Sequence, residues 1–126
     1  MAQRRSSEKI CIDVDALYYF LTAHDEFSLK AKQHIEDRSG ALATSLFSVW
    51  LLHVLTNLEN VCEMLDELEV DLLPLTKETF ALAKVLDKPR DYEDRVHIST
   101  MLQHGINTVI SNDRDFDGIP EVKRIF

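Results

Sequence analysis

The chain has 126 residues, a length that fits a single domain. Apolar residues make up 45% of it, which supplies a hydrophobic core without the help of disulfides or a structural metal. The net charge of −8, from 22 acidic and 14 basic residues, argues against a protein that holds nucleic acid by its overall charge. We find no export signal and no membrane-spanning segment in the sequence.

The start of the chain and its cysteines indicate how the protein is organised. Residues 1–8 are polar and basic, so we expect a flexible tail there and a single domain over residues 9–126. Cys11 and Cys62 both lie in apolar sequence and outside any metal-binding spacing. We therefore expect two reduced core thiols and a cytoplasmic location.

The first half of the chain predicts two strands with helices after each of them. The β-branched run over residues 9–14 is typical of a buried strand. Asp15 is the expected N-cap of the helix that follows this strand. The other elements expected before residue 70 are a helix over 26–38, a strand over 41–45, and helices over 45–58 and 60–69.

The second half continues the alternation of strands and helices. Thr76 is expected to cap a helix over 77–86, and Asp91 a helix that ends before Gly105. Strands over 70–75, 107–110 and 122–126 and a polar loop over 111–118 complete the prediction. This alternation, without hairpin signals, predicts a three-layer α/β/α fold with a mainly parallel sheet.

The helix expected over residues 45–58 is apolar on nearly all sides. One stripe consists of Phe47, Trp50, Leu51, Val54 and Leu58, and further leucines cover the remaining sides. A helix of this kind is buried against more than one neighbour. A sheet on one side and a second protomer on the other would bury it, so we expect a homodimer.

Acidic residues follow two of the predicted strands. Asp13 ends the first strand, and Asp113 and Asp115 lie just past the fourth. Asp94, in the first turn of the preceding helix, shares a helix face with Ile98. Parallel sheets gather their functional groups at the carboxyl ends of the strands. These four acids therefore meet in one cleft if the first and fourth strands are neighbours.

Local roles offer another explanation for some of these acids. Asp94 could complete a capping box with Asp91, and Asp113 could simply form a turn. Asp13 has no such role, because it ends a buried strand, and the coincidence of the four acids favours a site. Their carboxylates suit one or two Mg²⁺ or Mn²⁺ ions, which activate water and stabilise charge on a phosphate. The expected reaction is phosphodiester hydrolysis.

Three blocks of the sequence resemble the PIN-domain nucleases, and in particular the VapC toxins of VapB–VapC toxin–antitoxin pairs. The blocks are ICIDVDALYYFL, ATSLFSVWLLHVLTN and YEDRVHISTMLQHGINTVISNDRDFDGIPEVKRI, of which the last is the most specific. The resemblance implies a three-layer α/β/α fold, hydrolysis of RNA by a metal-dependent endoribonuclease, dimerisation and inhibition by an antitoxin protein.

The same resemblance implies roles for individual residues. Asp13, Asp94 and Asp113 match the metal-binding acids of the family, and Asp115 matches a supporting acid. Two further positions, Ser111 and Asp15, match polar residues that orient ligands or substrate.

Trp50 departs from the family pattern. The family usually carries a catalytic Glu at this place on the central helix, and tryptophan cannot bind a hard cation. His53 and Glu59 are candidate replacements, although a lone His on an apolar helix is more often a hydrogen-bonded core residue. The alternative function is a PIN-like domain that binds RNA or protein with weakened or lost catalysis.

Contact with RNA would have to come from local basic residues. Arg90, Arg95 and Arg114 neighbour the acids in sequence, although each is more commonly a solvated surface charge. The chain also begins with a basic segment that contains Arg4, Arg5 and Lys9.

Two other functional classes also fit parts of the sequence. Asp13 and Asp15 resemble the nucleophile motif of haloacid-dehalogenase-type phosphatases, in which Ser45 and Lys84 would take the remaining roles. A purely structural interaction protein would use the apolar central helix as a partner surface and its acids as helix caps.

Overall fold

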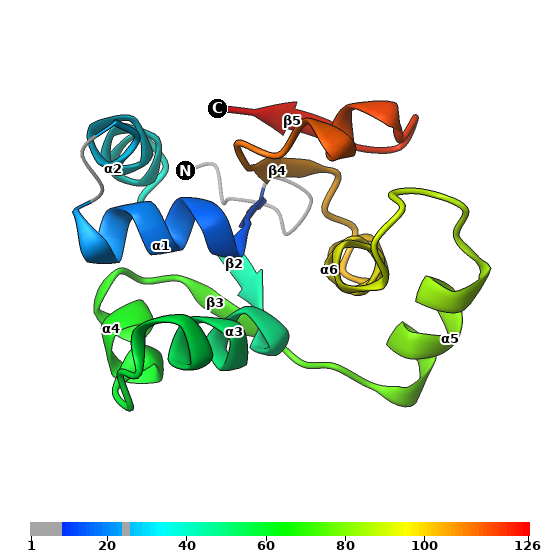
Figure 1. The fold of residues 1–126 in the computed structure, drawn as a ribbon, viewed down its shortest axis with the longest axis horizontal. Coiled ribbons are helices and arrows are strands. Elements are labelled where there is room, and N and C mark those ends of the chain that lie inside the picture. Colours follow the sequence, from blue (N-terminus) through cyan, green and yellow to red (C-terminus); the bar gives the residue numbers. More distant parts are fainter. Residues whose placement is uncertain (1–8, 24–25) are drawn as a thin grey trace, which may run out of the picture.

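The computed structural model describes residues 9–23 and 26–126, and the tail predicted over residues 1–8 lies outside these ranges. A five-stranded sheet is flanked by α-helices on both faces (Figure 1). In chain order the elements are β1 (Ile10–Ile12), α1 (Val14–Thr22), α2 (Ser28–Asp37), β2 (Leu42–Ser45), α3 (Leu46–Thr56), α4 (Val61–Glu67), β3 (Asp71–Leu73), α5 (Lys77–Val85), α6 (Tyr92–Gln103), β4 (Thr108–Ile110), the 3-10 helix η2 (Arg114–Gly118) and β5 (Lys123–Ile125).

The sheet has the strand order β3-β2-β1-β4-β5, and all of its strand pairs are parallel. The central strand β1 lies between β2 and β4, with Cys11 opposite Ala43 on one side and Val109 on the other. The first and fourth strands are therefore neighbours, which is the condition under which the four acids can meet in one cleft. Their carboxyl ends meet at one edge of the sheet.

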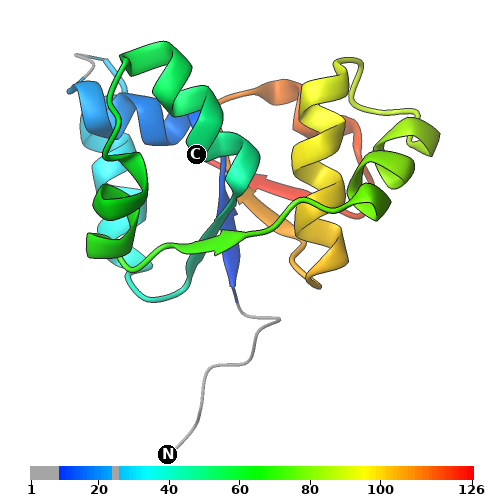
Figure 2. The same ribbon diagram turned by 90° about the horizontal axis from the view of Figure 1, so that it is seen from below.

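Successive residues of the central strands face opposite sides of the sheet and enter two separate cores. Cys11 packs in one core with Ile98 and Met101 of α6. Ile12 packs in the other core with Leu17 of α1. Figures 1 and 2 show α1 to α4 on one side of the sheet and α5 and α6 on the other. The predicted three-layer α/β/α fold is confirmed.

Two predictions about single residues are wrong. The N-cap of α1 is Asp13 and not Asp15, because the chain becomes helical directly after the strand, at Val14. Cys62 is exposed, whereas Cys11 is buried as expected. Helix α4 buries Val61 and Leu65, four residues apart, and this places Cys62 on another side of the helix.

Helix α3 is only partly buried in the single chain. It turns Ser48 and Leu52 inward, while Trp50, Val54 and Leu55 are 60%, 59% and 57% exposed. The stripe predicted to be buried therefore lies mostly on the outside. Apolar residues occupy more of the helix surface than the side that packs against the domain. The outward side of α3 is therefore an exposed apolar surface.

The segment predicted as a polar loop contains the short helix η2. Phe116 of this helix is 1% exposed and belongs to the core beneath α6. A single buried aromatic side chain therefore fixes the loop to the body of the domain. Among the described residues, none of the helices has the length and apolar character that crossing a membrane requires.

Candidate metal centre

Asp13 and Ser111 begin the site, because each directly follows one of two neighbouring strands. The Asp13 N–H donates to the carbonyl oxygen of Ile110 (2.9 Å), which keeps the ends of β1 and β4 level. The buried Ser111 hydroxyl then donates to Oδ2 of Asp13 (2.9 Å). The carboxylate that ends β1 is thus held by the residue that follows β4.

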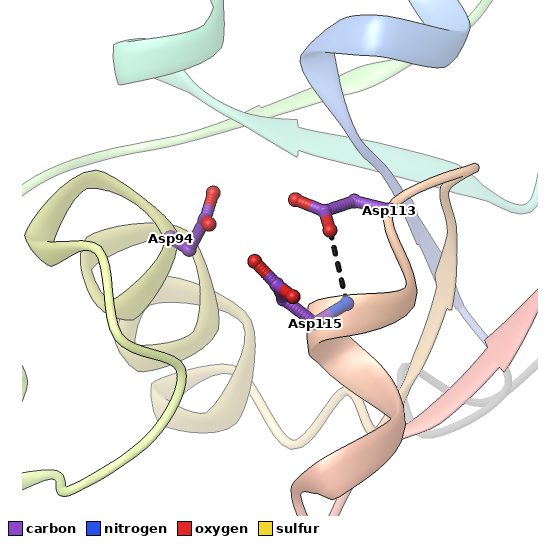
Figure 3. A group of neighbouring side chains, drawn as sticks. All are labelled: Asp94, Asp113 and Asp115. Carbon is purple, nitrogen blue, oxygen red and sulfur yellow. Dashed lines mark hydrogen bonds between the residues drawn. The ribbon is translucent and has the colours of Figure 1, made fainter.

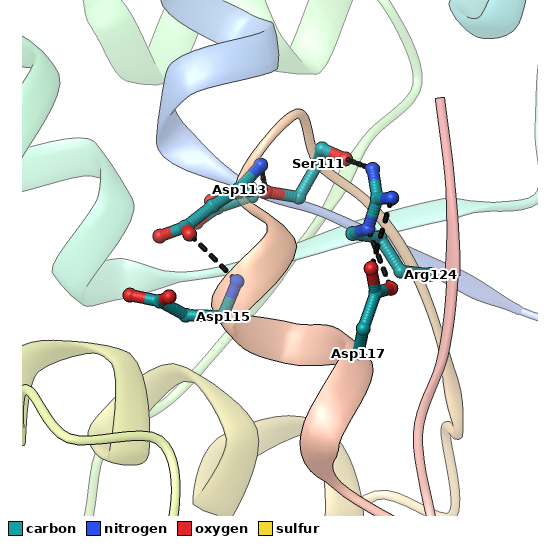
Figure 4. A network of polar contacts seen from close by, with 6 residues as sticks. Ser111, Asp113, Asp115, Asp117 and Arg124 are labelled. Atoms are coloured by element: carbon teal, nitrogen blue, oxygen red, sulfur yellow. Dashed lines mark hydrogen bonds and ion pairs between the residues drawn. The ribbon is translucent and has the colours of Figure 1, made fainter.

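The chain beyond Ser111 places two more acids. The Asp113 N–H donates to the Ser111 hydroxyl (3.0 Å), and the Asp115 N–H donates to Oδ1 of Asp113 (2.9 Å). Figure 4 shows this series of contacts along the segment that leads into η2. Asp113 is the N-cap of η2, so its predicted turn-forming role and its place in the site are compatible.

Asp94 approaches these acids from α6. One carboxylate oxygen from each of Asp94, Asp113 and Asp115 lies within 4.8 Å of the other two (Figure 3). Ile98, one turn further along α6, is fully buried and anchors the helix face that carries Asp94. Three of the four acids singled out in the sequence therefore converge, and Asp13 is joined to them through Ser111.

The charges of the acids act on one another. Burial, together with the nearby charges of Asp13 and Asp113, raises the pKa of Asp94 to about 7. Burial also raises the pKa of Asp13, with Asp113 adding to the effect. The Asp15 pKa is raised to about 7 by burial and by the charge of Asp13. Asp13 is thus in electrostatic reach of both Asp94 and Asp113.

These residues fit a divalent cation. The Oδ1 atom of Asp13 is buried and has no hydrogen-bond partner among residues 9–23 and 26–126, although an unpaired buried carboxylate oxygen is energetically costly. The donor set consists of carboxylate oxygens, the ligands that hard cations such as Mg²⁺ and Mn²⁺ prefer. A cation at this position would offset both the missing partner and the mutual repulsion of the acids.

Arg124 supports the site, although no sequence pattern predicts this role. Its guanidinium donates to both carboxylate oxygens of Asp117 (2.8 and 3.2 Å) and to the Ser111 carbonyl oxygen (3.1 Å). Figure 4 shows Arg124 joining Asp117 to the Ser111 backbone beside the acids. Its contribution depends on the pairing of β5 with β4, which no local sequence pattern reveals.

His97 is a second supporting residue that sequence reasoning missed. Its Nδ1 atom lies 3.0 Å from the hydroxyl of Ser45, which also caps α3 by accepting from the Ser48 N–H (3.1 Å). Burial lowers the pKa of His97 to about 4, so the ring is neutral near pH 7. His97 thus ties α6, one turn after Asp94, to the end of β2.

The candidate replacements for an acid on α3 lie away from this group. Helix α3 starts at the carboxyl end of β2 and runs away from it, so His53 lies about two turns, roughly 10 Å, along the helix. The His53 Nδ1 atom is 2.9 Å from the Leu58 carbonyl oxygen, and the His53 ring packs against Trp50. Glu59 is exposed beyond the end of the helix.

The basic residues named from the sequence have different surroundings. Arg95 donates to the carbonyl oxygens of Ala83, Pro89 and Arg90, so it holds the α5–α6 connection. Lys9 pairs with Asp71 at the amino ends of the strands, the opposite edge from the acids. Arg90 and Arg114 are exposed, whereas Arg4 and Arg5 lie outside the described residues.

Three of the acids can be reached from solvent. Asp115 is exposed, and Asp94 and Asp113 are half-buried. A hollow lined by Leu86, Lys88 and Ile119 contains none of them. An open, acid-lined edge admits a long polymer more readily than a small molecule that must be enclosed.

Comparison with known proteins identifies relatives by sequence profile and by structure. The family model described as "PIN domain" matches residues 10–122. No curated protein sequence shows significant similarity to the chain.

Among solved structures, a toxin–antitoxin complex from Klebsiella pneumoniae is similar, with a TM-score of 0.73 and 18% identity over 91% of this chain and 96% of the other. The sarcin–ricin-loop-cleaving toxin VapC20 of Mycobacterium tuberculosis has a TM-score of 0.65 and 17% identity over 91% and 99%. VapBC2 of Rickettsia felis, bound to a promoter DNA fragment, has a TM-score of 0.60 and 13% identity over 92% and 96%. At these identities the likeness concerns the fold.

Proposed function

The chain belongs to the PIN domain family, and from this premise we propose that it is a metal-dependent endoribonuclease of the toxin type. The observation that carries the proposal is the convergence of Asp94, Asp113 and Asp115 beside the unpartnered oxygen of Asp13. Membership of this family also disfavours the alternative function of a haloacid-dehalogenase-type phosphatase. Consistent with that, the Ser45 hydroxyl is engaged by His97 and Ser48, and Lys84 is exposed on α5.

In this proposal Asp13, Asp94 and Asp113 hold one or two Mg²⁺ or Mn²⁺ ions, and Asp115 supports them. When bound, such ions lower the pKa of water to give a nucleophile and stabilise negative charge on the phosphate. Ser111 keeps the Asp13 carboxylate in place by donating to it, and it also accepts from the Asp113 N–H. The site is thereby assembled before RNA arrives.

RNA would meet the acids along the open edge of the sheet. The chain carries a net charge of −8, so its own charge repels a phosphate backbone. Bound cations would bridge acids and phosphate, and the exposed Arg90 and Arg114 near the acids would add local positive charge. Arg95 does not take part in this role, because its guanidinium is held by backbone carbonyls.

The proposal is tested by RNA cleavage in the presence of Mn²⁺. We expect the wild-type chain to cut RNA and Asp113→Asn to lose activity by about 100-fold or more, because a metal-binding carboxylate is removed. Asp66→Asn, a matched change on the exposed side of α4, should leave the rate unchanged. Wild-type protein that fails to cleave any RNA class, with or without Mn²⁺, would contradict the proposal.

One observation favours the alternative, in which the domain binds RNA or protein with weakened or lost catalysis. Helix α3 contains no acidic residue, and Trp50 stands exposed on it. RNA that binds equally well to the wild type and to Asp113→Asn, without cleavage by either, would support this alternative.

We also propose an antitoxin protein as a partner, because two of the similar structures are toxin–antitoxin assemblies. A pull-down with the product of an adjacent small gene tests this idea, and the absence of a stable complex would count against it. The cytoplasmic location expected from the cysteines stays a prediction, which fractionation of cells that express the full chain would check.

A further inference from the structure

Asp15 presents a second buried carboxylate oxygen at this site, and no group among the described residues donates a hydrogen bond to it. We propose that Asp15 is a further ligand of the divalent ion, in addition to Asp13, Asp94, Asp113 and Asp115. The inference rests on the proposed function, because it concerns the same ion site.

The carboxyl groups of Asp13 and Asp15 lie close together at the end of β1. Asp13 ends β1, and Asp15 lies in the first turn of α1. Their carboxyl groups are within hydrogen-bonding reach of each other. No group in the part of the chain that the structure describes donates a hydrogen bond to the buried Oδ1 atom of either residue, and Asp13 as a whole is 6% exposed. Two buried carboxylate oxygens side by side repel each other unless a proton or a cation lies between them.

The charges around Asp13 and Asp15 also favour a cation. The charge of Asp113, as well as that of Asp13, acts on Asp15, so Asp15 lies near the same group of acids. Arg124 is close enough to interact with Asp15 and Asp113, but it directs its hydrogen bonds to Asp117 and the Ser111 carbonyl. The acids of the group are Asp13, Asp15, Asp94, Asp113 and Asp115. One shared proton neutralises one of these five charges, whereas each divalent ion neutralises two.

The two helices α1 and α3 differ in the ligand atoms that they offer at this edge of the sheet. Helix α3 borders the same edge of the sheet and offers no carboxylate, because it lacks acidic residues. Helix α1 starts at that edge and offers the free Oδ1 of Asp15. Mg²⁺ and Mn²⁺ take six oxygen ligands, so an additional carboxylate with an unpaired oxygen atom is suited to the ion.

The inference is tested by calorimetric titration of the full chain with Mn²⁺. We expect Asp15→Asn to weaken Mn²⁺ affinity about tenfold or more, and Asp66→Asn to match the wild type. If the wild type binds Mn²⁺ and Asp15→Asn binds it equally well, the inference is overturned and the proposed function stands. If the wild type does not bind Mn²⁺, the proposed function itself fails.

A second variant separates direct ligation from a structural role, since an acid in the first turn also stabilises a helix. Asp15→Cys, made in a Cys62→Ser background, places a soft thiolate where the carboxylate was. We expect one equivalent of Cd²⁺ to produce a thiolate-to-metal charge-transfer absorption that Cys62→Ser alone does not show, because its remaining Cys11 is buried. Identical spectra for the two proteins would overturn the inference.

Discussion

At the scale of single residues, the site consists of carboxylates placed where their charge is costly. Asp13 is buried, and Asp15 and Asp94 are partly buried beside other acids. All three therefore have a raised pKa in the folded chain. In the unfolded chain these acids have their ordinary pKa near 4, and this difference links stability to pH.

Without metal, the folded protein should lose stability as pH rises from about 4 to about 7. Across this range the folded state binds more protons than the unfolded state, so the free energy of unfolding falls with pH. Urea unfolding of the wild type and Asp94→Asn in EDTA measures the effect, and we expect the variant to gain stability relative to the wild type as pH rises. His97, whose lowered pKa acts in the opposite direction, is present in both proteins, so its contribution largely cancels. A difference between the two proteins that does not change with pH would contradict the prediction.

Residues that carry charge at strand ends were predictable from the sequence, and residues that support them were not. Asp13 and Asp113 stand out because each follows an apolar strand and the carboxyl ends of parallel strands share an edge. His97 and Arg124 act through partners 52 and 13 residues away, Ser45 and Ser111. Such partners are defined only by the folded structure. The sequence also does not show that α1 begins directly after Asp13. Asp13 therefore takes the N-cap position that was predicted for Asp15.

At the scale of elements, β5 and η2 fix the position of the segment that carries Asp113 and Asp115. Phe116 anchors η2 in the core, and Arg124 joins Asp117 of η2 to the backbone of Ser111. The Ser111 N–H also donates to the Ile125 carbonyl oxygen (3.0 Å). The last strand therefore positions Asp113 and Asp115 without supplying a ligand.

Arg124→Gln should lower Mn²⁺ affinity about tenfold, because groups that orient metal ligands typically contribute an effect of this size. Arg124→Lys should recover little of the loss, since an ammonium group cannot donate to Asp117 and Ser111 with the same fork geometry. Calorimetric titration measures both, with the exposed Arg90→Gln as the control. Equal affinities for Arg124→Gln and the wild type would show that β5 has no positioning role.

The order and type of the strands and α-helices could be predicted from the sequence, whereas the short helix η2 could not. The alternation of strands and helices predicted each strand and α-helix in place, and Thr76 caps α5 as expected. The segment over 111–118 was predicted as a loop because most of its residues are polar. Its one buried aromatic residue, Phe116, gives no periodic signal. A five-residue 3-10 helix is too short to leave a periodic pattern.

At the scale of the whole molecule, the sheet is covered on both faces and yet α3 keeps an apolar exterior. Trp50, Val54 and Leu55 lie exposed there, and exposed apolar groups of this kind are typical of protein interfaces. The sequence predicted that α3 has more apolar surface than one neighbour can bury. It could not predict which side faces the domain.

We expect a homodimer that buries this surface of α3. Val54→Asp and Leu55→Asp should shift the chain towards monomer, because each places a charge in the apolar contact. Val85→Asp is the matched control, since Val85 is 73% exposed on α5. Light scattering after size exclusion measures the mass of each protein. A wild-type chain that is monomeric at high concentration would exclude the dimer.

The central claim is that acids from β1, α6 and the segment after β4 hold a divalent ion. Crystals of the full chain soaked in Mn²⁺ and measured for anomalous scattering test it most directly. We predict an anomalous peak in contact with carboxylate oxygens of Asp13, Asp94 and Asp113, and its loss in Asp113→Asn crystals. A well-ordered structure at saturating Mn²⁺ with no peak among these acids would contradict the account.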